Sequence, residues 1–206
     1  LKLSYNNIRK EVFMKSILKK EVYEVTIKHS KFIGVIIPIE SLDDIKDNLN
    51  KLKEEYKNAT HYCYAFKLIN DKGCSDDGEP NKTAGIPILN VIEGNDLINV
   101  LVVVIRYFGG IKLGPGGLIR AYSNTCKEVI NKSTLIDLIK GLEASISFTY
   151  SNEKEINYLL KNCIIKNKDY EQNCTYIIET TKEILDSISN LVTINYVNEK
   201  IIPKLN

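Results

Sequence analysis

The chain has 206 residues, and its 28 basic and 26 acidic side chains give a formal net charge of +2. This length is long for one typical domain and short for three, and contents of 44% apolar and 26% charged residues are ordinary for globular protein. No apolar run approaches the roughly 20 residues of a membrane-spanning helix, and no stretch has the pattern of a signal peptide. We therefore expect a soluble cytoplasmic protein without membrane association.

The charges are distributed unevenly. Residues 138–206 contain 8 lysines and 9 acids, and all three arginines lie in residues 1–137. A net charge of +2 is too small to identify a nucleic-acid-binding protein by itself, so only a local cluster of cations could do so.

The five cysteines indicate neither a disulfide framework nor a zinc site. Their number is odd, they include no C-x-x-C pair, and only two histidines accompany them. We expect small, mostly buried side chains in a reducing compartment.

Residues 1–13 precede the only methionine, Met14, and have no hydrophobic period. Lys10-Glu11-Val12 can be encoded by a strong bacterial ribosome-binding sequence, which would lie just before the Met14 codon. We therefore expect a misassigned start, so that residues 1–13 are untranslated. A flexible N-terminal tail is the alternative.

The first third of the chain predicts two strands, a helix and a third strand. Glu21–Lys28 and Lys31–Ile39 are rich in β-branched and aromatic residues, and His29-Ser30 is a plausible tight connection between them. Ser41 is the expected N-cap of a helix that ends near Tyr56. Thr60–Leu68 alternates with the period of a strand.

The middle of the chain predicts a helix, a buried strand and a second helix. Thr83–Ile92 fits a short helix, and Ile98–Phe108 contains the apolar run Val100–Ile105, which indicates a strand covered on both faces. A glycine-rich loop, Gly109–Gly117, leads into a helix that opens at Pro115. The apolar residues expected on one face of this helix are Ile119, Tyr122, Cys126, Val129 and Ile130.

The remainder predicts the ferredoxin-like order βαββαβ. We place the domain boundary near Leu138–Leu142, where Gly141 can end the preceding helix, and expect domains at residues 14–137 and 138–206. The expected elements are Glu143–Tyr150, Glu153–Cys163, two strands across Ile165–Thr180, Lys182–Leu191 and Thr193–Ile202.

An acidic loop, Ser75–Pro80, is the first candidate site. Asp76, Asp77 and Glu79 lie within four residues, and such carboxylates repel one another unless a cation, an arginine or backbone donors compensate them. A solvated acidic turn is the structural alternative.

A glycine-rich stretch, Arg106–Tyr122, is the second candidate. It leads from a buried strand into a helix start, where free N–H groups and the helix dipole favour an anion. Its spacing matches neither G-x-x-x-x-G-K-[ST] nor G-x-G-x-x-G, and tight turns with close packing are the structural alternative. The residues expected to bind an anion or nucleic acid are Arg106, Gly109, Gly110, Lys112, Gly114, Gly116, Gly117 and Arg120. Arg120 belongs to the polar face of the expected helix.

Three motifs together resemble the YigZ/IMPACT family. They are Ala59-Thr60-His61-x-Cys63-x-Ala65, Ser75-Asp76-Asp77-Gly78-Glu79-Pro80-x-x-Thr83-Ala84-Gly85-x-Pro87-Ile88-Leu89, and Arg106–Tyr122. The resemblance covers about residues 29–133, and it departs at Asn81 and Lys82, where the family commonly has small residues.

The resemblance implies an α+β protein. The first domain would be an α/β sandwich similar to ribosomal protein S5 domain 2 and to domain IV of elongation factor G. The second would be ferredoxin-like, similar to domain V of that factor. Eukaryotic members regulate translation by binding an activator of an initiation-factor kinase. By analogy of fold, we expect this chain to have a surface that faces nucleic acid or the ribosome. That expectation is better supported than binding to the eukaryotic partner.

Two function classes follow, with a third beside them. The first is a translation-associated protein that binds RNA or the ribosome without catalysis or cofactor, in which the acidic loop orders the site by pairing with arginine. The alternative is an enzyme acting on a phosphorylated or nucleotide-like substrate. In that reading Asp76, Asp77 and Glu79 hold Mg²⁺ and His61 moves a proton, although a lone strand histidine is more often a packed, hydrogen-bonded residue. A regulator that binds a protein partner is the third. The oligomeric state is not predicted.

Overall fold

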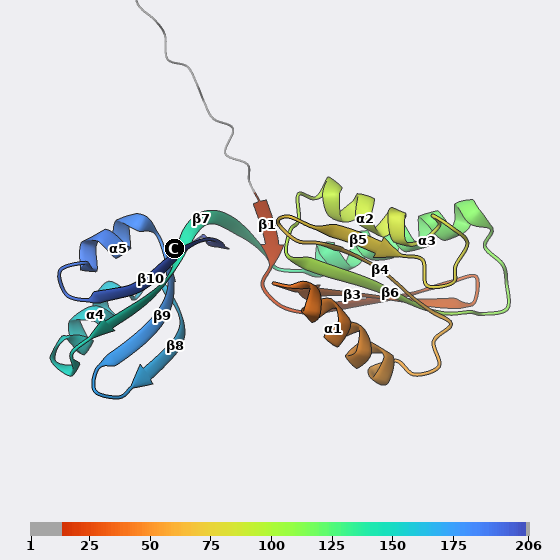
Figure 1. Ribbon diagram of the computed structural model, residues 1–206. Helices are drawn as coiled ribbons and strands as arrows, with labels where there is room; N and C mark the ends of the chain where they lie inside the picture. Colours follow the sequence, from red (N-terminus) through yellow and green to blue (C-terminus); the bar gives the residue numbers. More distant parts are fainter. Residues whose placement is uncertain (1–13, 205–206) are drawn as a thin grey trace, which may run out of the picture. The chain divides into compact units, whose positions relative to one another are not determined.

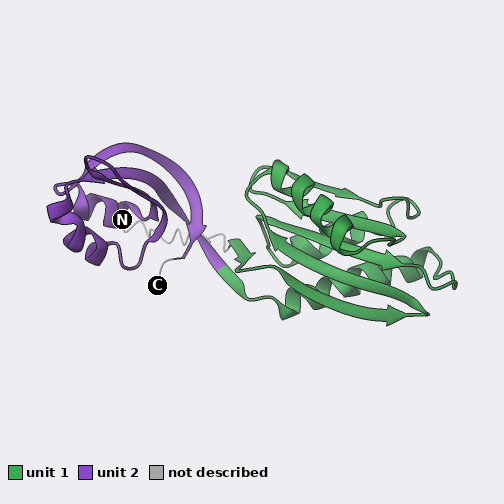
Figure 2. Cartoon of the chain, turned by 90° about the horizontal axis from the view of Figure 1, so that it is seen from below, with its two compact units in different colours: residues 1–136 green, residues 137–206 purple. Residues whose placement is uncertain are grey.

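The computed structural model describes residues 14–204 and shows a mixed α/β protein with two antiparallel sheets (Figure 1). The chain divides into two compact units, residues 1–136 and 137–206 (Figure 2). This division lies one residue from the expected one. The expectation about residues 1–13 falls outside the described residues. No helix in the described part of the chain is long and apolar enough to span a membrane.

The first unit is built on a five-stranded sheet in the order β2-β3-β6-β4-β5, with every neighbouring pair antiparallel. Its strands are β2 (Glu21–Ile27), β3 (Ser30–Pro38), β4 (His61–Lys67), β5 (Lys72–Ser75) and β6 (Val100–Tyr107), and β1 (Met14–Ile17) precedes them. β2 and β3 form the predicted hairpin, but its connection is Lys28-His29. Both of these residues have positive φ (44° and 64°), as a two-residue type I′ turn requires. β5 was not predicted.

Helices cover both faces of this sheet (Figure 1): α1 (Leu42–Glu55) packs on one face, and α2 (Gly85–Gly94) and α3 (Pro115–Lys132) pack on the other. Ser41 caps α1 as predicted, in a capping box with Asp44. The run Val100–Ile105 is fully buried, with alternate residues contributing to the two cores, so the prediction of a strand covered on both faces is confirmed.

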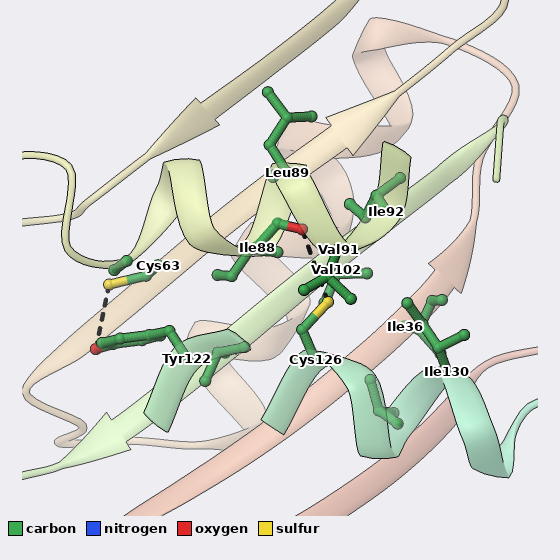
Figure 3. Close-up of a cluster of buried hydrophobic side chains, with 14 of the residues drawn as sticks. Ile36, Cys63, Ile88, Leu89, Val91, Ile92, Val102, Tyr122, Cys126 and Ile130 are labelled. Carbon is green, nitrogen blue, oxygen red and sulfur yellow. Dashed lines mark hydrogen bonds between the residues drawn. The ribbon is translucent and has the colours of Figure 1, made fainter. Parts of the chain in front are cut away.

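Figure 3 shows the core between the sheet and the helices α2 and α3. Aliphatic side chains of α2 meet Tyr122 and Cys126 of α3 over Val102 of β6. The expected apolar face of α3 was wrong at one position, because Ile119 is 42% exposed whereas Leu118 is buried. The Sγ of Cys126 lies 3.8 Å from the carbonyl oxygen of Ile88.

The second unit has the predicted element order βαββαβ. Its elements are β7 (Leu135–Phe148), a 3₁₀ turn (Tyr150–Asn152), α4 (Glu153–Leu159), β8 (Ile164–Tyr170), β9 (Cys174–Thr180), α5 (Lys182–Ile188) and β10 (Thr193–Pro203). The four strands pair antiparallel in the order β10-β7-β9-β8. Gly141 was predicted to end a helix, but it lies inside β7. A Cβ there would approach Ile202 Cδ1 to 2.3 Å, so the glycine permits close packing against β10.

Candidate functional site

A buried charged cluster joins the acidic loop to the ends of β4 and β6. Glu79 Oε1 lies 2.5 Å from Nη1 of Arg106, and the two side chains are only 4% and 5% exposed. The same oxygen accepts a hydrogen bond from the hydroxyl of Tyr122 on α3 at 2.8 Å. Residues far apart in the sequence therefore meet at one carboxylate oxygen.

Arg106 lies on the face of β6 that is covered by α2 and α3, because it continues the alternation of Val102 and Val104. Its Nη2 donates to the hydroxyl of Ser30 at 3.3 Å, and its guanidinium carbon lies 5.3 Å from the ring centroids of both Phe32 and Phe108. Its Nε has no hydrogen-bond partner among the described residues. Arg106 was expected to contact phosphates. The structure corrects this, because the guanidinium is buried and neutralised by Glu79.

Tyr122 and Cys63 extend the cluster into the core (Figure 3). The Cys63 thiol lies 3.3 Å from the Tyr122 hydroxyl and donates to the backbone carbonyl of Asp76 at 2.9 Å. Burial raises the pKa of Cys63 to about 12 and also raises the pKa of Tyr122. Both groups therefore stay protonated at neutral pH and act as hydrogen-bond donors.

Asp76 and Asp77 are occupied by backbone donors. The Asp76 carboxylate accepts hydrogen bonds from the N–H groups of Lys82, Ala84 and Gly85 at 2.8 to 2.9 Å, at the start of α2. Asp77 accepts from the N–H of Tyr62 at 2.6 Å. Partial burial raises the pKa of Asp76, but these hydrogen bonds outweigh it, so that pKa lies below its usual value of 3.8.

This arrangement does not fit the magnesium site of the enzyme alternative. Glu79 pairs with Arg106, while Asp76 and Asp77 bind separate backbone groups. Within residues 14–204, no group of three or more His, Cys, Asp or Glu side chains is placed to hold a metal ion. The structure compensates the carboxylates of the acidic loop with an arginine and with backbone donors, which are two of the three kinds of partner that the sequence predicted. The predicted pairing of the acidic loop with an arginine is therefore present.

His61 opens β4 beside the cluster. Its Nδ1 lies 2.8 Å from the carbonyl oxygen of Asp77, and because a carbonyl only accepts, Nδ1 carries the proton. Nε2 lies 3.9 Å from Glu79 Oε1. His61 is thus a packed, hydrogen-bonded side chain that holds the acidic loop to β4.

Glycines serve two different purposes in the glycine-rich segment: one allows close packing of the backbone, and others allow a positive φ. A Cβ on Gly109 would lie 2.0 Å from the backbone of His29, so only glycine lets this loop pack on the β2-β3 turn. Gly110 and Gly114 have φ values of +82° and +70°, and a Cβ on either would meet nothing within 4 Å. Gly116 and Gly117 lie in the first turn of α3, after Pro115.

The two other expected cations of this segment are exposed. Lys112 lies in the loop between β6 and α3, and Arg120 lies on α3. The Nη1 atom of Arg120 lies 3.7 Å from the position that a Cβ on Gly116 would occupy, so the Arg120 guanidinium reaches back to the start of the helix. No Asp or Glu occurs between Asp96 and Glu128. The structure therefore separates the buried, neutralised Arg106 from Lys112 and Arg120, the two exposed cations of a stretch without acids.

Sequence reasoning missed the hydroxyl groups that fix this loop. Ser30 Oγ accepts from the N–H of Gly109 at 3.1 Å, and Thr60 Oγ1 accepts from the N–H of Phe108 at 3.0 Å. Thr60 belongs to one of the family motifs, which was the available signal, whereas nothing in the local sequence marks Ser30.

Comparisons with known proteins identify the family of this chain. The family model for the Impact N-terminal domain matches residues 28–130, which contain the whole cluster. IMPACT family member YvyE of Bacillus subtilis is 34% identical over 165 residues, or 76% of each chain. IMPACT family member YigZ of Escherichia coli is 32% identical over 152 residues, or 70% of this chain and 74% of that protein.

A solved structure has the same fold. The crystal structure of a hypothetical protein aligns with a TM-score of 0.62 at 25% identity, over 88% of this chain and 95% of that one. The resemblance inferred from the three motifs is thus confirmed, and the chain belongs to the IMPACT family.

Proposed function

We propose that this protein binds RNA or the ribosome through the surface of residues 108–120, without a catalytic step, and regulates translation. The observation that carries the proposal is the separation of charges at the site. The carboxylates of the acidic loop bind protein donors, whereas Lys112 and Arg120 are exposed in a stretch without acids. Cations in such a setting attract phosphates, which supply most of the affinity of nucleic-acid binding.

The backbone at the start of α3 supports the same function. The first N–H groups of a helix lack partners within the helix, and the dipole makes this end attractive to anions. Gly114 occupies the N-cap position and the first turn carries no acidic side chain, so nothing in the first turn neutralises this end. A phosphate can approach the exposed Gly116 closely, and Arg120 reaches the same point.

The translational role rests on the family. The resemblance implies that eukaryotic members regulate translation, and it implies that both domains are similar to domains of a translation factor. Binding to ribosomal RNA or to ribosome-associated RNA is the form of this role that the charge distribution of the first unit favours.

The test is the salt dependence of RNA binding. Each phosphate contact releases counterions, so log K falls with log[salt] in proportion to the number of contacts. We expect wild-type protein to bind structured RNA or ribosomal particles at low salt, and the slope for Arg120→Ala to be shallower by about one unit. Lys154→Ala is the control, because it removes the same charge from an exposed position on α4.

Two results would contradict the proposal. One is the absence of RNA or ribosome binding by wild-type protein at low ionic strength. The other is a slope for Arg120→Ala that equals those of wild-type protein and of Lys154→Ala. In either case a protein partner becomes the better explanation of the exposed surface of residues 108–120.

A further inference from the structure

The side chain of Phe108 is exposed directly outside the buried ion pair. It is 47% exposed, although it follows a strand whose preceding apolar residues are fully buried. Its backbone N–H is fixed by Thr60, and the Arg106 guanidinium lies over its ring, 5.3 Å from the centroid. Arg106 is itself held by Glu79. The ring therefore rests on a rigid support and presents its remaining surface to solvent.

Two aliphatic side chains of the same segment are also exposed. Ile111 in the loop and Ile119 on α3 are each 42% exposed, within the same segment as Lys112 and Arg120. The segment thus combines an aromatic ring, aliphatic surface and cations. Duplex RNA presents mainly phosphates and riboses, because its bases are stacked inside, whereas an unpaired nucleotide presents both a phosphate and a free base face. This combination of exposed side chains suits an unpaired nucleotide better than a duplex.

We propose that Phe108 is a stacking platform for an unpaired RNA base, whose neighbouring phosphates contact Lys112 and Arg120. This inference rests on the proposed function and names its ligand as single-stranded RNA. Charge complementarity supports it, since Lys112 and Arg120 are the only charged side chains from residue 108 to residue 120 and both are exposed. Every base has a flat face, so we expect a preference for single strands over duplexes with little sequence selectivity.

A tryptophan at position 108 tests the contact directly. The chain contains no tryptophan, so Phe108→Trp introduces a unique fluorophore. We expect a short single-stranded RNA to quench its emission because a base stacks on the indole, and the same strand annealed to its complement to leave the emission unchanged. Tyr158→Trp is the control, since Tyr158 is 69% exposed in the second unit and its emission should not respond.

Affinity gives an independent readout. We expect Phe108→Leu to bind labelled single-stranded RNA about tenfold more weakly. The slope of log K against log[salt] should stay unchanged, because no cation is removed. A thermal melt of each variant establishes that it is folded before binding is compared.

The outcomes separate this inference from the function on which it rests. If RNA saturates the protein without quenching Phe108→Trp, or if folded Phe108→Leu binds as tightly as wild type, the stacking proposal is overturned and RNA binding stands. Equal quenching by the duplex also overturns it. If wild-type protein binds no RNA at low salt, the proposed function fails and the stacking proposal fails with it.

Discussion

Glu79 and Arg106 form a buried ion pair that fastens the acidic loop to the end of β6 across 27 residues of sequence. Removing two charges from water is costly, and the pair is tolerable because each group has further partners. Tyr122 donates to the carboxylate, and the guanidinium donates to Ser30 and lies against two aromatic rings. The loop thereby acquires one conformation, and Phe108 and the glycine-rich segment acquire a fixed base.

The first prediction concerns this pair. We expect Glu79→Gln to lower the free energy of unfolding by about 3 kcal/mol, because it leaves the Arg106 charge buried without a counter-charge. Urea denaturation measures the loss. Because the chain has two units, hydrogen exchange at the amides of β6 is needed to assign the transition to the first unit.

Glu93→Gln is the matched control for this prediction. Glu93 pairs with Lys72 at 2.6 Å, but these side chains are 34% and 55% exposed, so the same substitution should change stability by less than about 1 kcal/mol. Equal losses in the two variants would show that burial does not determine the contribution of the Glu79–Arg106 pair.

Much of the fold follows from the sequence because its signals are local. The capping residue Ser41 and the continuous apolar run of β6 each depend on a short stretch of chain, and both predictions were confirmed. Ile119 was wrongly assigned to the buried face of α3 because two neighbouring rows of apolar side chains begin at the start of this helix. One runs from Leu118 and the other from Ile119, and local spacing does not say which residue the sheet covers.

The site was predictable only in part, for a physical reason. Three adjacent carboxylates require compensation, and this need was visible in the sequence. The choice between a metal ion, an arginine and backbone donors depends on which groups the fold brings near each carboxylate. From the sequence alone, Arg106 was therefore interpreted as a free cation. In the structure, the register of β4 with β6 places Arg106 opposite His61 and beside Glu79.

The second prediction compares two adjacent glycines. We expect Gly109→Ala to destabilise the first unit by much more than Gly110→Ala, because the added Cβ at position 109 would lie 2.0 Å from backbone atoms of His29. Gly110→Ala meets no neighbour, and its cost is the strain of φ +82°, roughly 1 kcal/mol. The melting temperatures of the two variants measure this difference. Similar melting temperatures would mean that the loop does not need the close approach to the β2-β3 turn.

The third prediction concerns the pH dependence of stability. The pKa of Asp76 is lower in the folded protein than its usual value of 3.8. A lowered folded-state pKa contributes stability that is present above the unfolded-state pKa and is lost as the pH falls through the folded-state pKa. We expect Asp76→Asn to be about 1–2 kcal/mol less stable than wild type at pH 7, because a neutral amide serves the backbone N–H groups at the start of α2 less well. This difference should shrink as the pH falls below about 4.

Urea denaturation of both proteins between pH 7 and pH 3 tests the sign as well as the size of this effect. The control is Asp47→Asn, the same chemical change at an exposed position of α1, which should change stability by no more than about 0.5 kcal/mol. A difference between wild type and Asp76→Asn that stays constant down to pH 3 would mean that shape, not charge, makes Asp76 useful at the helix start. A difference that grows on acidification would reverse the assigned direction of the pKa. A loss confined to pH above about 4 identifies the ionised carboxylate as the group that holds the acidic loop on α2.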